Sequence, residues 1–181
     1  MKATPGVLPE VLLLEPRVFG DERGFFFESY SKRAFGELVG FDAQFVQDNH
    51  SRSARNVLRG LHYQLKQAQG KLVRVVSGEI FDVAVDLRRS SPRFGRWMAH
   101  RLSAQNKSML WIPSGFAHGF LSLAADTEVL YKTTDYYAPE HERCVLWNDR
   151  DIGIDWPLDG APMVSPKDAK GVALKDAQVY E

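Results

Sequence analysis

Several segments of the sequence carry side chains that could bind or deprotonate a small molecule. The most informative segment is Arg59-Gly-Leu-His62, in which a histidine follows an arginine by three positions. A neutral imidazole, with an ordinary pKa of about 6.5, can take a proton from a carbon that an adjacent ketone makes acidic. The arginine could hold an anionic group of the same substrate. Most single histidines are surface or core residues, so this segment needs support from the rest of the chain.

Two further residues supply the chemistry that proton removal next to a ketone would require. The enolate that forms needs a cation or a hydrogen-bond donor, and Lys71 could provide it. Inversion of a stereocentre also requires a proton from the face opposite the base, which a tyrosine hydroxyl such as that of Tyr131 could donate. The ordinary alternatives are a solvated lysine beside a turn and an aromatic residue packed in the core.

The pattern of apolar and polar residues predicts that these side chains lie on strands. In residues 81–87 every second position is apolar, which is typical of a strand with one face in a core. Ser31 is expected to cap a short helix over residues 32–38, and residues 168–172 to form a single turn. So many strands with so little helix favour a sandwich or a barrel. Other runs typical of strands occur at residues 11–14, 25–30, 44–49, 72–76, 108–112, 120–123 and 129–133.

Length and composition narrow the class of protein. The 181 residues fit one domain, residues 1–181, which is long enough to bury a core without disulfide or metal support. The single cysteine, Cys144, excludes an intramolecular disulfide. The N-terminus lacks an apolar signal-peptide core and no segment is apolar enough to span a membrane, so a cytoplasmic protein is expected. The formal net charge of zero gives no indication of a nucleic-acid partner.

Further polar segments extend the candidate set: Arg23-Gly-Phe-Phe-Phe-Glu28, Gln47-Asp-Asn49, Pro113-Ser-Gly-Phe-Ala-His118-Gly and Lys167-Asp168. Together with Arg59-Gly-Leu-His62, Lys71 and Tyr131, and in this order over nearly the whole chain, they resemble the dTDP-4-dehydrorhamnose 3,5-epimerase family. The resemblance implies an all-β, cupin-type jelly-roll barrel with a few short peripheral helices and a site in the barrel mouth. It also implies epimerisation of C3 and C5 of dTDP-4-dehydro-6-deoxy-D-glucose to dTDP-4-dehydro-L-rhamnose, without a cofactor, for rhamnose synthesis in a bacterial cell envelope.

The resemblance also implies roles for individual residues. It makes His62, Tyr131, Asp168 and Lys71 catalytic, with Asp168 as the carboxylate that fixes the His62 tautomer, although a helix cap is the commoner role for an aspartate at that position. His118 would contact the substrate, oriented by Asp82. The implied substrate-binding residues are Arg23, Phe26, Glu28, Gln47, Asp48, Asn49, Arg59, His118, Tyr137, Glu142 and Lys167, with Arg59 and Lys167 on the diphosphate.

The same resemblance predicts a homodimer, because the Phe25-Phe26-Phe27 segment comes from the partner subunit in this family. No metal site is expected: cupins that bind a metal offer His-x-His and a glutamate in their first motif, whereas here the motif is His62-Tyr-Gln64 with Lys71 downstream. Three alternatives stay open: an epimerase acting on one carbon of a related nucleotide sugar, a non-catalytic sugar-nucleotide-binding cupin, and a metal-dependent cupin.

Overall fold

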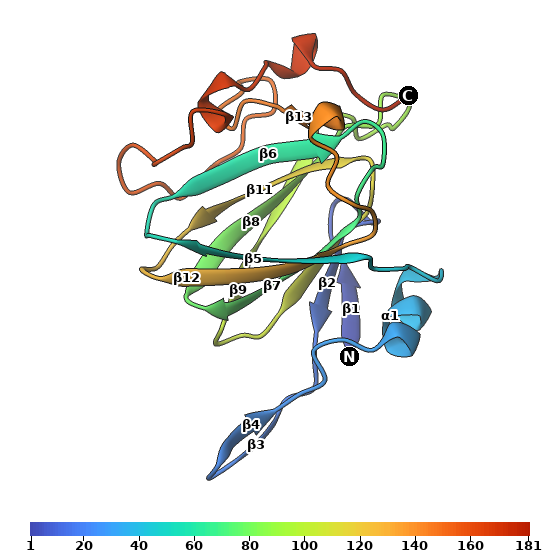
Figure 1. The fold of residues 1–181 in the computed structure, drawn as a ribbon, viewed down its shortest axis with the longest axis vertical. Helices are drawn as coiled ribbons and strands as arrows, with labels where there is room; N and C mark the ends of the chain where they lie inside the picture. The colour runs from blue at the N-terminus through green and yellow to red at the C-terminus, as the bar shows by residue number, and fades with distance from the viewer.

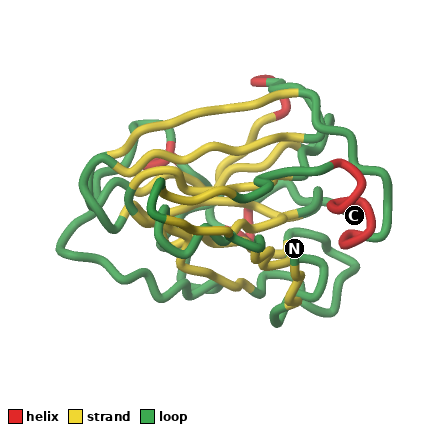
Figure 2. The backbone as a smooth tube through the Cα atoms, turned by 90° about the horizontal axis from the view of Figure 1, so that it is seen from below, coloured by secondary structure: helices red, strands yellow, loops and turns green.

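Two antiparallel sheets face each other and form the body of the molecule, which a computed structural model describes over all 181 residues (Figure 1). The first sheet has the strand order β1-β2-β10-β7-β12-β5 and the second the order β13-β6-β11-β8-β9. Figure 2 shows that strands fill the body of the molecule and that loops join them at its ends. The predicted all-β jelly roll with few helices is confirmed, and no helix is long and apolar enough to cross a membrane.

Strands make up most of the regular structure, and the helical segments are short. The strands are β1 (Lys2–Pro5), β2 (Leu12–Glu15), β3 (Phe19–Asp21), β4 (Gly24–Phe26), β5 (Gln47–Ser53), β6 (Leu58–Gln64), β7 (Lys71–Ser77), β8 (Glu79–Asp86), β9 (Trp97–Ser103), β10 (Met109–Ile112), β11 (Phe116–Ser122), β12 (Thr127–Thr133) and β13 (Glu142–Cys144). The helical segments are α1 (Lys32–Val39) and three single-turn 3₁₀ helices, η1 (Pro139–His141), η2 (Asp168–Lys170) and η3 (Leu174–Asp176).

Alternation along the strands divides the core into three apolar clusters: one between the sheets, one on the outer face of the second sheet, and one where α1 packs on the first sheet through Phe35. On β8, Ile80 and Ala84 pack between the two sheets, whereas Val83 and Val85 pack on the outer face of the second sheet. The chain after β13 covers this outer face, as the red segment in Figure 1 shows, and contributes residues such as Trp156 to the second cluster. Because the interior between the sheets is shared by apolar and polar side chains, polar positions on several strands can meet in one cavity.

Several predicted boundaries shift in the structure. The strand predicted over residues 44–49 is β5, Gln47–Ser53, and the one predicted over residues 25–30 ends already at Phe26. Strands β1, β3, β9 and β13 were not predicted from the pattern, because β1, β3 and β13 are very short and β9 carries His100 and Arg101 within its alternation. The helix prediction is confirmed: the Ser31 hydroxyl accepts a hydrogen bond from the backbone N–H of Ala34 (3.4 Å).

The hairpin β3–β4 stands apart from both sheets. Its strands pair with each other and form a separate two-stranded sheet, which projects away from the body in Figure 1. Phe19, Phe25 and Phe26 are 50%, 62% and 71% exposed on it. Apolar side chains on a projecting hairpin of this size are typical of a surface that another chain covers.

A bulge in β6 determines which of its side chains face the cavity. His62 pairs with His118, whereas Arg59 pairs with Phe120, so three steps along β6 match two steps along β11. Residues three apart would point to opposite faces of a regular strand; the extra residue lets Arg59 and His62 face the same side. The bulge depends on close backbone contact, since a Cβ on Gly60 would lie 2.6 Å from the Cα of Gly119.

This contact predicts a specific effect of Gly60→Ala. Gly60 has a φ of 117°, so alanine would suffer both backbone strain and overlap with β11. We expect the free energy of unfolding to fall by about 2–5 kcal/mol, the sum of the two penalties. Gly24 has a similar φ of 127° but nothing within 4 Å of an added Cβ. Gly24→Ala should therefore cost at most about 1–2 kcal/mol in urea unfolding. Equal losses in the two variants would argue against a packing role for Gly60.

Candidate active site

A cavity of about 650 Å³ opens between the two sheets. Its walls come from β5, β6, β7, β11 and β12, from the start of β13, and from the segment that leads into η2. It brings together residues that the sequence spreads over more than one hundred positions. The predicted site residues that line it are Gln47, Asn49, Arg59, His62, Lys71, His118, Tyr131, Tyr137, Glu142, Lys167 and Asp168.

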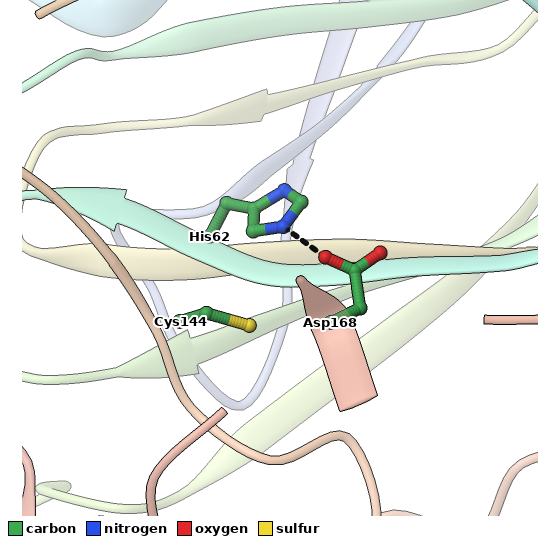
Figure 3. Close-up of side chains that lie close together, drawn as sticks. All are labelled: His62, Cys144 and Asp168. Atoms are coloured by element: carbon green, nitrogen blue, oxygen red, sulfur yellow. Dashed lines mark hydrogen bonds and ion pairs between the residues drawn. The ribbon is translucent and has the colours of Figure 1, made fainter. Parts of the chain in front are cut away.

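His62 and Asp168 form a hydrogen-bonded pair on the wall of the cavity. His62 Nε2 lies 2.6 Å from Asp168 Oδ1, as Figure 3 shows. Asp168 is 2% exposed. Burial by itself raises the pKa of this carboxyl, but the hydrogen bond and charge of His62 outweigh it and hold the pKa below its usual range. An ionised Asp168 accepts the Nε2 proton, which leaves Nδ1 of the neutral imidazole as the nitrogen that can accept a proton.

The position of Asp168 depends on the turn that it starts. Its backbone N–H donates to the Ser165 hydroxyl (3.1 Å), which fixes the chain just before η2. The sequence suggested a helix cap as the ordinary role of this aspartate, but its side chain bonds His62 and the residue at the N-cap of η2 is Lys167. The carboxylate therefore serves the histidine and not the local helix.

Lys71 points into the same cavity from the opposite sheet. It is 8% exposed, and its Nζ lies 3.4 Å from the backbone oxygen of His62. Burial lowers the Lys71 pKa to about 8, although the charges of Glu142 and Asp82 oppose this shift. An ammonium group with few protein partners in a buried cavity is well placed to meet a negatively charged oxygen of a ligand.

His118 lies next to His62 across the pair of strands β6 and β11. Its Nε2 is 2.7 Å from Asp82 Oδ1, which confirms the pairing expected from the sequence. Asp82 is fully buried and projects from β8 into the interior between the sheets. The cavity therefore contains two His–Asp pairs, one near the mouth and one deeper among the strands.

Tyr131 faces the cavity from β12 of the first sheet, whereas His62 belongs to β6 of the second. The two side chains thus approach the cavity from opposite walls. Burial raises the Tyr131 pKa, and the charge of Arg59 acts in the other direction without reversing the shift. The phenol stays protonated at neutral pH and can act as a proton donor.

Polar side chains at the mouth form a second group. The hydroxyl of Tyr137 donates to Glu142 Oε2 (2.7 Å), and Lys167 Nζ pairs with the same oxygen. Burial raises the Glu142 pKa, but the hydrogen bonds from Lys167 and Tyr137 outweigh it and lower the pKa. Arg59 is held by Ser53 Oγ (3.0 Å from Nε) and by the backbone oxygen of Arg52 (3.2 Å from Nη2). Its remaining donors are free to bind an anion.

Four predicted site residues lie outside this cavity. Asp48 alternates to the outer face of β5 and pairs with Lys132 (2.9 Å), while its neighbours Gln47 and Asn49 face inward. Arg23 and Phe26 belong to the projecting hairpin, where Arg23 pairs with Asp21. Glu28 follows the hairpin and is exposed. Within one chain, the structure brings none of these four residues to the cavity.

Other residues that line the cavity were not predicted from the sequence. Ser51 follows Gln47 and Asn49 on the inner face of β5, so the alternation of that strand could have identified it. Gln69, Met163 and Ser165 come from loops, where no periodicity indicates orientation. Cys144 lies beside the pair: its Sγ and the nearest ligand atoms of His62 and Asp168 all lie within 4.8 Å of one another (Figure 3).

Comparison with known proteins identifies the family to which this chain belongs. Residues 6–176 match the model of the family described as dTDP-4-dehydrorhamnose 3,5-epimerase. The chain is 65% identical over 180 residues to the dTDP-4-dehydrorhamnose 3,5-epimerase of Pseudomonas aeruginosa, with 99% of each chain covered. The chain belongs to the dTDP-4-dehydrorhamnose 3,5-epimerase family. This membership confirms the resemblance seen in the ordered motifs.

Solved structures agree with the family assignment. The dTDP-6-deoxy-D-glucose-3,5-epimerase of Legionella pneumophila, in complex with dTDP-4-keto-L-rhamnose, superposes with a TM-score of 0.96 at 50% identity; 98% of this chain and 94% of that chain are covered. ChmJ from Streptomyces bikiniensis, a 3'-monoepimerase in complex with dTDP-quinovose, gives a TM-score of 0.90 at 34% identity, with coverages of 94% and 87%. The jelly roll is thus shared by epimerases that differ in the carbons they invert.

The buried ammonium of Lys71 predicts a pH dependence of stability. Its pKa is about 8 in the folded state and 10.5 as a free side chain, so the unfolded chain binds this proton more tightly. Stability should therefore rise as the pH increases from 8 to 10.5, by about 3 kcal/mol from this group when fully deprotonated. The matched variant Lys71→Met lacks the titrating group. The difference in unfolding free energy between Lys71→Met and wild type should shrink across this range in urea titrations, and a constant difference would contradict the depressed pKa.

Proposed function

We propose that the protein is a cofactor-independent epimerase that converts dTDP-4-dehydro-6-deoxy-D-glucose into dTDP-4-dehydro-L-rhamnose by inverting C3 and C5. Family membership supports this substrate and reaction. The observation that carries the chemistry is the placement of the His62–Asp168 pair and Tyr131 on opposite walls of one cavity. This arrangement offers one proton acceptor and one proton donor to the two faces of a sugar ring.

The first step is removal of a proton next to the C4 ketone. His62 accepts it at Nδ1, and the resulting imidazolium is stabilised by the Asp168 carboxylate bonded to Nε2. The electrons of the C–H bond move into the ketone and place a negative charge on its oxygen. The Lys71 ammonium group, buried and facing the cavity, stabilises this enolate oxygen.

The second step returns a proton to the other face of the same carbon. The Tyr131 hydroxyl donates it, and its raised pKa keeps it protonated before the step. His62 then releases its proton to solvent and Tyr131 regains one, after which the same two steps at the second carbon, on the other side of the ketone, complete the double epimerisation. His118, held by Asp82, contacts the sugar deeper in the cavity.

The nucleotide end of the substrate occupies the mouth. Arg59 and Lys167 bind the diphosphate, because a guanidinium fork and an ammonium group match its oxygens. Gln47 and Asn49 face the same space from β5 and supply amide groups for the sugar or the base. Tyr137 and Glu142 complete this wall through their mutual hydrogen bond.

The active assembly is a homodimer in which the β3–β4 hairpin extends to the partner subunit. The exposed phenylalanines of the projecting hairpin support this arrangement. Arg23, Phe26 and Glu28 then contact the nucleotide bound in the partner's cavity, with Phe26 stacked on the pyrimidine ring. The enzyme acts in the cytoplasm and supplies rhamnose precursors for the cell envelope.

Epimerisation at one carbon is the second candidate, favoured by the likeness of the fold to ChmJ, a 3'-monoepimerase. Incubation with the 4-keto sugar nucleotide in deuterium oxide distinguishes double epimerisation from epimerisation at one carbon. Deuterium at both C3 and C5 supports the double epimerase, and deuterium at C3 alone supports the single one. The absence of deuterium at either carbon would exclude both.

The variant Tyr131→Phe should separate proton removal from inversion. His62 can still remove a proton and return a solvent deuteron to the original face, so exchange next to the ketone should persist while epimerised product is lost. Nuclear magnetic resonance in deuterium oxide measures both. Phenylalanine keeps the packing of the ring, so the fold is preserved. His62→Ala is the control that should lose exchange and inversion together, by roughly 10² to 10⁴ in rate. Near-wild-type epimerisation by Tyr131→Phe would rule out this donor.

Substitutions in the β3–β4 hairpin test whether the protein forms the proposed dimer. Phe25→Asp with Phe26→Asp places charges where an apolar contact is proposed, so the protein should become monomeric in sedimentation analysis and lose affinity for dTDP. Val7 is 71% exposed and lies outside the hairpin. Val7→Asp should therefore leave both properties unchanged. A double variant that stays dimeric with full dTDP affinity would show that the hairpin does not reach the partner's site.

A further inference from the structure

Cys144 has no part in the proposed mechanism, yet it lies beside the catalytic pair. It is directly opposite His62 in the register of β13 and β6, and Asp168 approaches both from η2. One ligand atom from each of the three residues lies within 4.8 Å of the other two, as Figure 3 shows. We propose that His62, Cys144 and Asp168 form a binding site for a soft divalent cation such as Zn²⁺, and that its occupation inhibits the epimerase.

The three side chains supply the ligand types that Zn²⁺ prefers. Imidazole nitrogen, thiolate sulfur and carboxylate oxygen bind it at about 2.0–2.3 Å, in tetrahedral sites that often keep one position for water. Atoms bound to one such ion stand roughly 3–4 Å apart, so the cluster needs modest adjustment. The His62–Asp168 contact of 2.6 Å must open slightly, and Cys144 Sγ must turn from its present neighbour, the backbone oxygen of Val145 (3.6 Å).

The charges of the site balance when the ion binds. Cys144 releases its thiol proton to solvent, so the thiolate and the Asp168 carboxylate together neutralise the dication. Lys167 is already paired with Glu142, which limits its repulsion of the ion. Lys71 stays as the opposing charge near His62. A soft ion with strong affinity for sulfur can overcome it, whereas Mg²⁺ cannot, because Mg²⁺ prefers oxygen ligands and keeps its water.

The ion reaches the site through the substrate cavity. His62 and Asp168 both line this cavity, and the His62 side chain is 27% exposed. Cys144 is half-buried behind them on β13.

Binding of the ion prevents His62 from acting as the base. The ion takes the lone pair of His62 Nε2, and the proton that this nitrogen shared with Asp168 moves to Nδ1. Nδ1 then carries a proton and cannot accept one from the sugar. This inference rests on the proposed function for the inhibition, but not for the binding site itself. The site differs from a metal-dependent cupin centre because the ion opposes the reaction.

Binding and inhibition can be measured separately on chelator-treated protein. Cd²⁺ bound to a thiolate produces an ultraviolet charge-transfer band, so titration of wild type with Cd²⁺ should give this band and saturate at one equivalent. Cys144→Ala and Cys144→Ser should lack it. Absence of the band in wild type would overturn the site, whatever the enzyme catalyses.

Inhibition is then tested with Zn²⁺ in the epimerisation assay. Before metal is added, Cys144→Ala and Cys144→Ser should turn over like wild type. Loss of one of three ligands should raise the Zn²⁺ concentration for half-inhibition by about tenfold or more. Mg²⁺ at the same concentrations should not inhibit any of them. Equal Zn²⁺ sensitivity of wild type and Cys144→Ala would exclude inhibition at this site, as would a saturated Cd²⁺ band with undiminished turnover.

Discussion

The hydrogen bond between His62 and Asp168 is the contact on which the remaining structure of the site depends. It joins residues 106 positions apart, one on a central strand and one on a single 3₁₀ turn of the segment that covers the second sheet. Asp168 can be ionised while almost fully buried because His62 compensates for its loss of water. His62 in turn can act as a base because the carboxylate determines which of its nitrogens carries the proton. Fold and chemistry are coupled at this contact, because the segment that supplies Asp168 also supplies residues such as Trp156 to the core on the outer face of the second sheet.

The two sheets contribute different functions to the cavity. The second sheet supplies His62, the proposed proton acceptor, and His118, while the first supplies Lys71 and Tyr131. A sandwich whose interior is shared by polar and apolar side chains allows this separation, because each strand turns alternate residues inward. The bulge at Gly60 adds a local exception to that alternation and places Arg59 on the same side as His62. The proposed anion-binding group and the proposed base thus come from one strand and face one cavity, at a spacing that a regular strand would not permit.

The sequence predicted the fold class and most members of the site, but not their arrangement. Strand alternation correctly indicated that Lys71 and residues of β8 lie on strands, and the cap at Ser31 located the helix. Asp168 illustrates the limit. From local preferences it was a helix cap, and its true partner depends on contact between distant segments that no periodicity encodes. Asp48 is a different case, since the alternation of β5 alone places it on the face opposite Gln47 and Asn49, and the structure pairs it with Lys132 on that outer face. The ordered motifs over nearly the whole chain predicted the pairing of Asp168 with His62, which local preferences did not. They could do so because the resemblance to the family implies contacts between distant segments.

The order of synthesis gives the covering segment a further consequence. His62 and the strands from β5 to β12 leave the ribosome well before Asp168, which is 106 residues behind the histidine. Lys167 and the apolar residues that cover the second sheet, such as Trp156, belong to the same late segment. A nascent chain therefore presents Arg59 and Lys71 before it can complete either the second core cluster or the wall of the cavity that contains Lys167. The orienting carboxylate and the last part of the cavity wall arrive together, late in translation.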